Sequence, residues 1–179
     1  MARVPYLRRD DAAPGTEALW ERVEAERKMP TANIFRALAH APALLDAFLS
    51  YANALRDESE LEPRLRELAI LAVGHATGAE YEIAHHQSHA IRAGLTRQQI
   101  AAVADFESSD AFDDAELAVM RLARESTVQV DVPDRSWADA RGHLSDRQMV
   151  ELCMTIAWYN SGVRIMGSLG IELEDGYRP

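Results

Sequence analysis

The chain has a single cysteine, Cys153, among its 179 residues, so an internal disulfide is excluded. A chain without disulfides is typical of a reducing compartment. It also lacks any uncharged apolar run of the ~20 residues that a transmembrane helix needs. Charged residues stand near the N-terminus, where a signal peptide would have its apolar core. We therefore expect a cytoplasmic protein with no membrane partner.

Positive charge is scarce as well. The sequence has 19 Lys and Arg residues against 29 Asp and Glu residues, which gives a formal net charge of −10. It contains no stripe of Lys and Arg, so nucleic acids and anionic membranes are poor candidate partners. What is present, 47% hydrophobic and 27% charged residues, is typical of a globular protein. The length predicts a single domain, residues 1–179, with a buried core.

Prolines, glycines and capping residues predict where helices begin and end. Pro42 and Pro63 suit the first position of a helix, where a missing N–H costs nothing. Gly78 and Gly94 suit helix C-termini. A Ser, Thr or Asp followed three residues later by Gln or Glu is a capping-box signal. That spacing begins at Thr96, Asp113 and Ser145.

Helical periodicity then gives the expected elements. The chain begins with an arm at 1–15 and ends with a tail at 171–179. The only alternating apolar and polar stretch is short and contains Pro133, which argues against a strand. We expect a short apolar turn at 34–38 and an acidic loop at 106–112. Helices are expected over 16–28, 42–55, 63–77, 79–93 and 146–169, with shorter helical segments after 96, after 113 and around Trp137.

A weak internal repeat adds one detail to the fold. Glu67 and Gly78 recur 84 residues later as Glu151 and Gly162. The repeat predicts two similar helical hairpins and a break in the last helix at Gly162. The fold class that follows is all-α, a helical bundle with short connections.

The stretch 67–89 gathers titratable groups beside an apolar run. Four of the six histidines lie between His75 and His89. Where titratable side chains lie beside a buried apolar helix, burial and neighbouring charges can shift their pKa values into the range needed for acid/base catalysis. Glu67, on the apolar helix, is a candidate proton shuttle with a raised pKa at a pocket wall. The alternative is that Glu67 pairs with Arg64 or Arg66 at the start of the helix.

The second half of this stretch offers a candidate metal site. Glu82, His86 and His89 share one helix face. Glu82 with His85 forms Glu-x-x-His, and His85 with His89 forms His-x-x-x-His, spacings that can place two ligands on one metal. His85 and His86 point about 100° apart, so they do not both serve one site. Because no second helix carries ligands, a solvated face with a few core histidines is the favoured interpretation.

Other polar residues have simpler interpretations. His75, one turn before a helix end, is expected to cap the last carbonyls. Cys153 lies in an apolar helical run and is expected to be a buried, inert thiol. Asn160 and Arg164 either satisfy each other across one helical turn or face an anionic ligand.

Several motifs resemble the carboxymuconolactone decarboxylase family, which includes the alkylhydroperoxidase-D-like proteins. They are Arg64-Leu-Arg-Glu-Leu-Ala-Ile-Leu, Glu80-Tyr-Glu-Ile-Ala-His-His, Arg92-Ala-Gly-Leu-Thr, Trp158-Tyr-Asn and Gly170-Ile-Glu-Leu-Glu. The resemblance spans roughly residues 33–174. It implies an alkylhydroperoxidase-D-like helical bundle that self-associates as a trimer or hexamer.

The peroxidase branch of that family has a glutamate and, twelve positions later, a Cys-x-x-Cys-x-x-x-His segment. Glu67 matches the glutamate and His86 matches the histidine, but Ala79 and Glu82 stand where the two cysteines would be. Disulfide-based chemistry needs a thiolate nucleophile at one of these two positions, and the only cysteine, Cys153, lies outside this segment. Thiol peroxidase activity is therefore not expected. A peroxidase-related name would describe only the family to which the sequence is similar, and not an activity.

The sequence resembles instead the decarboxylase-like branch, in which Glu-Tyr-Glu followed by His replaces the cysteines. The resemblance implies a cofactor-free carboxy-lyase that transfers a proton while a small organic acid loses CO2. His86 would be the acid/base and Glu67 and Glu82 would orient it or relay protons. Substrate-binding candidates are Tyr81, Asn160 and Arg164, with Arg164 as a carboxylate clamp. The alternatives are a metal-binding protein using Glu82, His85 or His89, and a non-catalytic oligomeric ligand-binding protein.

Overall fold

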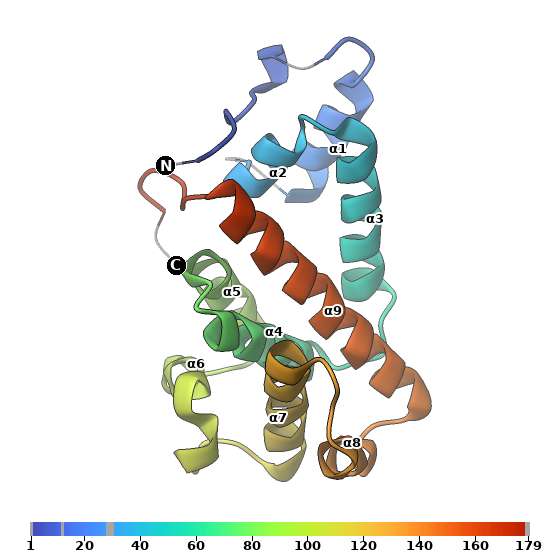
Figure 1. Ribbon diagram of the computed structural model, residues 1–179, viewed down its shortest axis with the longest axis vertical. Coiled ribbons are helices and arrows are strands. Elements are labelled where there is room, and N and C mark those ends of the chain that lie inside the picture. Colours follow the sequence, from blue (N-terminus) through green and yellow to red (C-terminus); the bar gives the residue numbers. More distant parts are fainter. Residues whose placement is uncertain (1, 12, 28–30, 178–179) are drawn as a thin grey trace. The chain divides into compact units, whose positions relative to one another are not determined.

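The computed structural model describes residues 2–11, 13–27 and 31–177, and the secondary structure in these ranges is helical, without a strand. The all-α prediction is confirmed. The helix end expected at 28–30 lies outside the described residues. The elements are η1 (Arg9–Asp11), α1 (Glu17–Arg27), α2 (Asn33–Leu38), α3 (Pro42–Asp57), α4 (Pro63–Thr77), α5 (Glu80–Arg92), α6 (Arg97–Ala102), η2 (Val103–Ser108), α7 (Asp114–Gln129), α8 (Asp134–Arg141) and α9 (Asp146–Leu169) (Figure 1).

The predicted helix starts have the expected hydrogen bonds. Complete capping boxes precede α6, at Thr96, and α7, at Asp113. At the start of α9, the Gln148 side chain accepts from the Ser145 N–H, and the Ser145 hydroxyl accepts from the Gln148 N–H. Each box satisfies donors that a helix N-terminus leaves unpaired.

Two expectations about helix limits are wrong. The helix α9 continues through Gly162, so the second half of the internal repeat is not a hairpin turn. A glycine costs a helix interior only about 1 kcal/mol, which the rest of α9 can offset. The expected loop at 106–112 is partly helical, because η2 extends to Ser108.

The chain divides into two compact units, the first made of residues 1–54 and 164–178 and the second of residues 55–163. In the first, Val23 of α1 packs with Leu45 and Leu49 of α3 in a small apolar core. The N-terminal arm and C-terminal tail meet in this unit, since the Glu172 N–H donates to the Tyr6 hydroxyl over 2.9 Å.

The second unit holds the residues 67–89. In it α4 contacts both α5 and α7, and α7 contacts α8. Its core consists of fully buried aliphatic and methionine side chains, among them Leu68, Leu71, Met120, Leu122 and Leu152. None of the helices in the described part of the chain is long and apolar enough to span a membrane.

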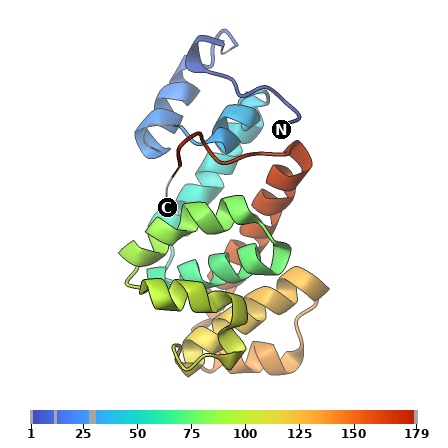
Figure 2. The same cartoon turned by 90° about the vertical axis from the view of Figure 1, so that its left-hand side faces the viewer.

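A tight helical hairpin joins α4 to α5 (Figure 2). Gly78 ends α4 in the left-handed conformation, with φ of 64°, as the sequence predicts. The Ala79 N–H donates to the Gly74 carbonyl over 2.9 Å, which closes the turn. Gly74 then lets the helices approach closely, because a Cβ at this position would lie 2.9 Å from Cγ1 of Ile83.

We expect Gly74→Ala to destabilise the protein by about 1–3 kcal/mol, since the added methyl overpacks the α4–α5 contact. Gly162→Ala is the matched control, because a Cβ there meets no atom within 4 Å. It should stabilise α9 by about 0.5–1 kcal/mol. Urea denaturation of both variants measures the two effects, and equal stability of the variants would contradict the close α4–α5 approach.

Candidate functional site

The hairpin brings Glu67 of α4 and His86 of α5 together. Nδ1 of His86 lies 2.7 Å from Oε2 of Glu67. On the other side of the ring, Nε2 of His86 lies 2.9 Å from Oε1 of Glu82, one turn earlier on α5. One imidazole is therefore hydrogen-bonded to a carboxylate at each nitrogen. We call Glu67, Glu82 and His86 the carboxylate–histidine cluster.

The cluster is buried. Glu67, Glu82 and His86 are 6%, 8% and 7% exposed. Buried charges are costly unless they are paired and hydrogen-bonded, and here each carboxylate has the same ring as its partner. The arrangement is thus stable only if the ring carries a proton on both nitrogens, each donating to one carboxylate.

The pKa of His86 follows from two opposing causes. Burial favours the neutral ring, but the charges and hydrogen bonds of Glu67 and Glu82 outweigh it and raise the pKa of His86 from 6.5 to about 10. For Glu67, burial favours the neutral acid, yet His86 holds the pKa of this carboxyl below its usual 4.5. At neutral pH the cluster is therefore an imidazolium with an ionised Glu67.

Two further aromatic rings surround His86. His89, one turn later on α5, stacks on it with centroids 5.1 Å apart. Tyr159 of α9 meets it edge-on, with centroids 5.0 Å apart and planes at 88°. Burial and the charge on His86 lower the pKa of His89 to about 4. Burial, with Glu67 and Glu82, raises the pKa of Tyr159 well above 10. Both rings are therefore neutral near pH 7.

The alternative partners of Glu67 are engaged elsewhere. Arg64 pairs with Glu116 and also donates to the Gly94 carbonyl. Arg66 donates to the backbone carbonyls of Leu55 and Arg56. The interpretation of Glu67 as an ion-pair partner of either arginine at the helix start is wrong, because His86 takes that place.

Two of the substrate-binding candidates, Tyr81 and Asn160, have contacts outside the cluster. Tyr81 is buried and stacks on His85, with centroids 4.4 Å apart. Asn160 donates to the Thr127 hydroxyl over 2.8 Å and to the Ile156 carbonyl over 3.1 Å. Arg164 belongs to the first unit, whereas the cluster lies in the second. Their roles in binding stay predictions.

The metal candidates do not converge on one point. Glu82 binds His86, His85 stacks on Tyr81, and His89 stacks on His86. In the described ranges, no three His, Cys, Asp or Glu side chains are grouped so as to hold a metal ion.

Cys153 and His75 also have defined surroundings. Burial raises the pKa of the half-buried Cys153 thiol, which disfavours the reactive thiolate. At the end of α4, the Thr77 hydroxyl donates to the Val73 carbonyl over 2.8 Å. The His75 ring, instead of capping that end, lines a cavity.

His89 and Tyr159 were not recognised in the sequence as neighbours of the His86 ring. His89 shares a helix face with His86, which indicates proximity, but its four-residue spacing from His85 is equally typical of a pair of metal ligands. The only signal for Tyr159 was that it interrupts the apolar run of the last helix.

The fold and site define an all-helical protein with a buried carboxylate–histidine–carboxylate cluster on one hairpin. Residues 42–125, which include this hairpin, match the carboxymuconolactone decarboxylase family. This stretch, just under half of the chain, is what the chain shares with that family. The protein YdfG of Bacillus subtilis (strain 168), named as uncharacterized, is 29% identical over 115 residues, which cover 63% of this chain and 78% of YdfG.

Solved structures show the same fold at low identity. An uncharacterized peroxidase-related protein of Ralstonia eutropha JMP134, with an alkylhydroperoxidase AhpD core, is 19% identical with a TM-score of 0.83, covering 97% of this chain and 93% of that one. A variant of the debrominase Bmp8 in complex with 2,3,4-tribromopyrrole is 21% identical with a TM-score of 0.82, covering 96% and 91%. The chain therefore has the alkylhydroperoxidase-D-like fold.

Proposed function

We propose that this protein is a cofactor-free, decarboxylase-like enzyme that transfers a proton to carbon as a small organic acid loses CO2. The observation that supports it is the His86 imidazole held between Glu67 and Glu82 in a buried place. Neighbours with this fold have names as different as debrominase and peroxidase-related protein, so the fold alone does not select a reaction.

The pKa of about 10 changes the role expected for His86. A general base works best with a pKa near the working pH, whereas this ring is protonated at neutral pH. In this proposal His86 therefore acts as the proton donor and not as a general base. A buried imidazolium also stabilises the negative charge that forms on a substrate as CO2 leaves.

The proposed step is a decarboxylation in which the substrate carbon is protonated. The C–C bond to the substrate carboxylate breaks and leaves its electron pair on carbon as a carbanion or enolate. That carbon takes the proton from Nε2 of His86, so a C–H bond forms as the N–H bond breaks. Glu67 holds the ring through Nδ1. Glu82, in the first turn of α5, turns aside to admit the substrate and then returns a solvent proton to the ring.

His86→Ala should lower the rate of CO2 release by about 10²- to 10⁴-fold, the usual contribution of a positioned acid. The assay would screen small organic acids for CO2 release in D2O, where each product should gain one deuterium at the carbon that lost CO2. His143→Gln, at an exposed histidine in the same unit, is the control and should keep full activity. Undiminished turnover by a folded His86→Ala protein would rule out the proposal.

A thiol peroxidase is the weaker candidate, because the cysteine positions of that branch hold Ala79 and Glu82 and the pKa of the Cys153 thiol is raised. We further propose that the enzyme works as a trimer or hexamer in the cytoplasm. The assembly rests on the family resemblance, and the compartment rests on the single cysteine and the lack of a long apolar run. Sedimentation measurements on the purified chain test the assembly, and a monomer would contradict it.

A further inference from the structure

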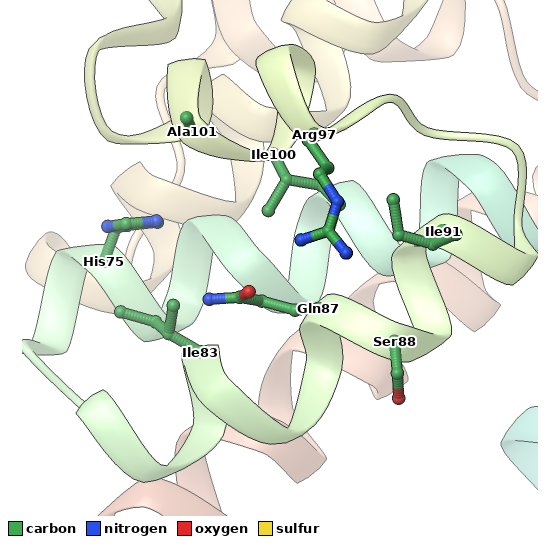
Figure 3. Close-up of a pocket in the computed structure, with 8 residues that line it drawn as sticks. All are labelled: His75, Ile83, Gln87, Ser88, Ile91, Arg97, Ile100 and Ala101. Atoms are coloured by element: carbon green, nitrogen blue, oxygen red, sulfur yellow. The ribbon is translucent and has the colours of Figure 1, made fainter. Parts of the chain in front are cut away.

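A cavity of about 380 Å³ lies in the second unit between the end of α4, one face of α5, and α6. Its volume falls in the range of small-molecule sites. The lining comprises His75, Ile83, Gln87, Ser88, Ile91, Arg97, Ile100 and Ala101 (Figure 3). None of the cluster residues lines it. Ile83, Gln87 and Ile91 lie on a different face of α5 from Glu82 and His86, because helix positions one apart differ by about 100°.

The lining combines an apolar wall with one cation. Ile83 and Ile91 of α5 and Ile100 of α6 supply branched aliphatic surface. The Arg97 guanidinium of α6 and the Gln87 amide of α5 point into the space between the two helices (Figure 3). Burial lowers the pKa of His75, so its ring is neutral near pH 7 and Arg97 supplies the only formal charge of the lining.

The charge of Arg97 is not compensated within the described ranges, where no carboxylate forms an ion pair with it. This contrasts with Arg64 of the same unit, which pairs with Glu116. A cation beside apolar surface favours an anionic ligand over a cationic one at this site. Guanidinium binds a carboxylate through two parallel hydrogen bonds.

We propose that this cavity is a binding site for a small carboxylate with an apolar body, separate from the carboxylate–histidine cluster. Arg97 binds the carboxylate at the exposed side, the Gln87 amide donates to the same group, and the isoleucines cover the apolar body. The inference does not depend on the proposed reaction, since none of the lining residues belongs to the cluster.

Benzoate is the probe, since it joins a carboxylate to a six-carbon ring. Titration calorimetry of the full chain should show saturable binding, at least about tenfold tighter than that of acetate, which lacks the ring, and of benzamide, which lacks the charge. In Arg97→Gln the affinity should fall at least about tenfold. Arg92→Gln, which removes another exposed charge at the end of α5 outside the cavity, should change it less than about twofold.

Amide shifts from NMR locate the probe. Benzoate should shift resonances of α5 and α6 near Gln87 and Arg97, and those shifts should persist in Glu82→Gln. No saturable binding up to about 10 mM benzoate would overturn the proposal. Equal affinity for benzamide, or unchanged affinity in Arg97→Gln, would do the same. Shifts confined to the surroundings of His86 would place the ligand at the cluster and also refute it.

Discussion

Replacing Glu67 and Glu82 together by glutamine is expected to lower the pKa of His86 from about 10 to below 6.5. Burial alone favours the neutral imidazole, and the two carboxylates are what overcome it. Glutamine keeps the size of the side chain and its hydrogen-bonding ability, so the variant removes charge and leaves the volume nearly unchanged. The ring should then be mostly neutral at pH 7. NMR titration of ¹⁵N-labelled histidine measures this pKa directly.

Single variants separate the two carboxylates. Glu67→Gln and Glu82→Gln should each give a pKa between the two limits, because each removes one of the charges next to the ring. Glu80→Gln is the control, since Glu80 is exposed on the same helix. A His86 pKa that stays near 10 in the double variant would show that the carboxylates do not cause the shift.

The double variant of Glu67 and Glu82 also tests whether His86 donates the proton in the proposed reaction. If His86 donates the proton, a ring that is neutral at pH 7 lacks the second proton it must give, so CO2 release should fall with the protonated fraction. Activity that recovers as the pH is lowered through the new pKa would support the donor role. Activity independent of this pKa would assign the proton transfer to another group.

Much of this site could be predicted because local rules determine it. Pro63 and Gly78 bound α4, and a two-residue connection forces α5 to turn back along it. A hairpin of this kind permits a residue in the first half of α4 to meet one in the middle of α5, and Glu67 and His86 do meet at 2.7 Å. The helix face shared by Glu82 and His86 follows from the four-residue spacing.

The remaining features depend on contacts that no local rule contains. The His86 pKa needs both carboxylates within hydrogen-bond reach of one ring, which spacing permits but does not require. Tyr159 of α9 contacts the His86 ring although it lies 73 residues later in the sequence. That contact therefore depends on how the helices of the second unit pack. The expected break at Gly162 failed for a different reason, because one glycine costs a helix only about 1 kcal/mol, which the rest of α9 can offset.

His86 should also make the protein less stable at alkaline pH. Its pKa is raised from 6.5 in the unfolded chain to about 10 in the folded one. A raised folded pKa contributes stability that is fully present below pH 6.5 and is lost as the pH rises through 10. The folded state binds more protons in that window, so the unfolding free energy should fall there by up to about 1.4 kcal/mol per pH unit.

His86→Gln should abolish this part of the pH dependence, because the variant has no group at that position that titrates between pH 6.5 and 10. Urea denaturation measures the unfolding free energy of the parent chain and of His86→Gln at several pH values between 6.5 and 10. The quantity compared is the difference between the two free energies at each pH. Groups that titrate there without interacting with His86 cancel in this difference. His143→Gln should retain the parental slope, since His143 is exposed and lies outside the cluster. Parallel curves for the parent chain and His86→Gln would mean that Glu67 and Glu82 do not hold the proton on the ring.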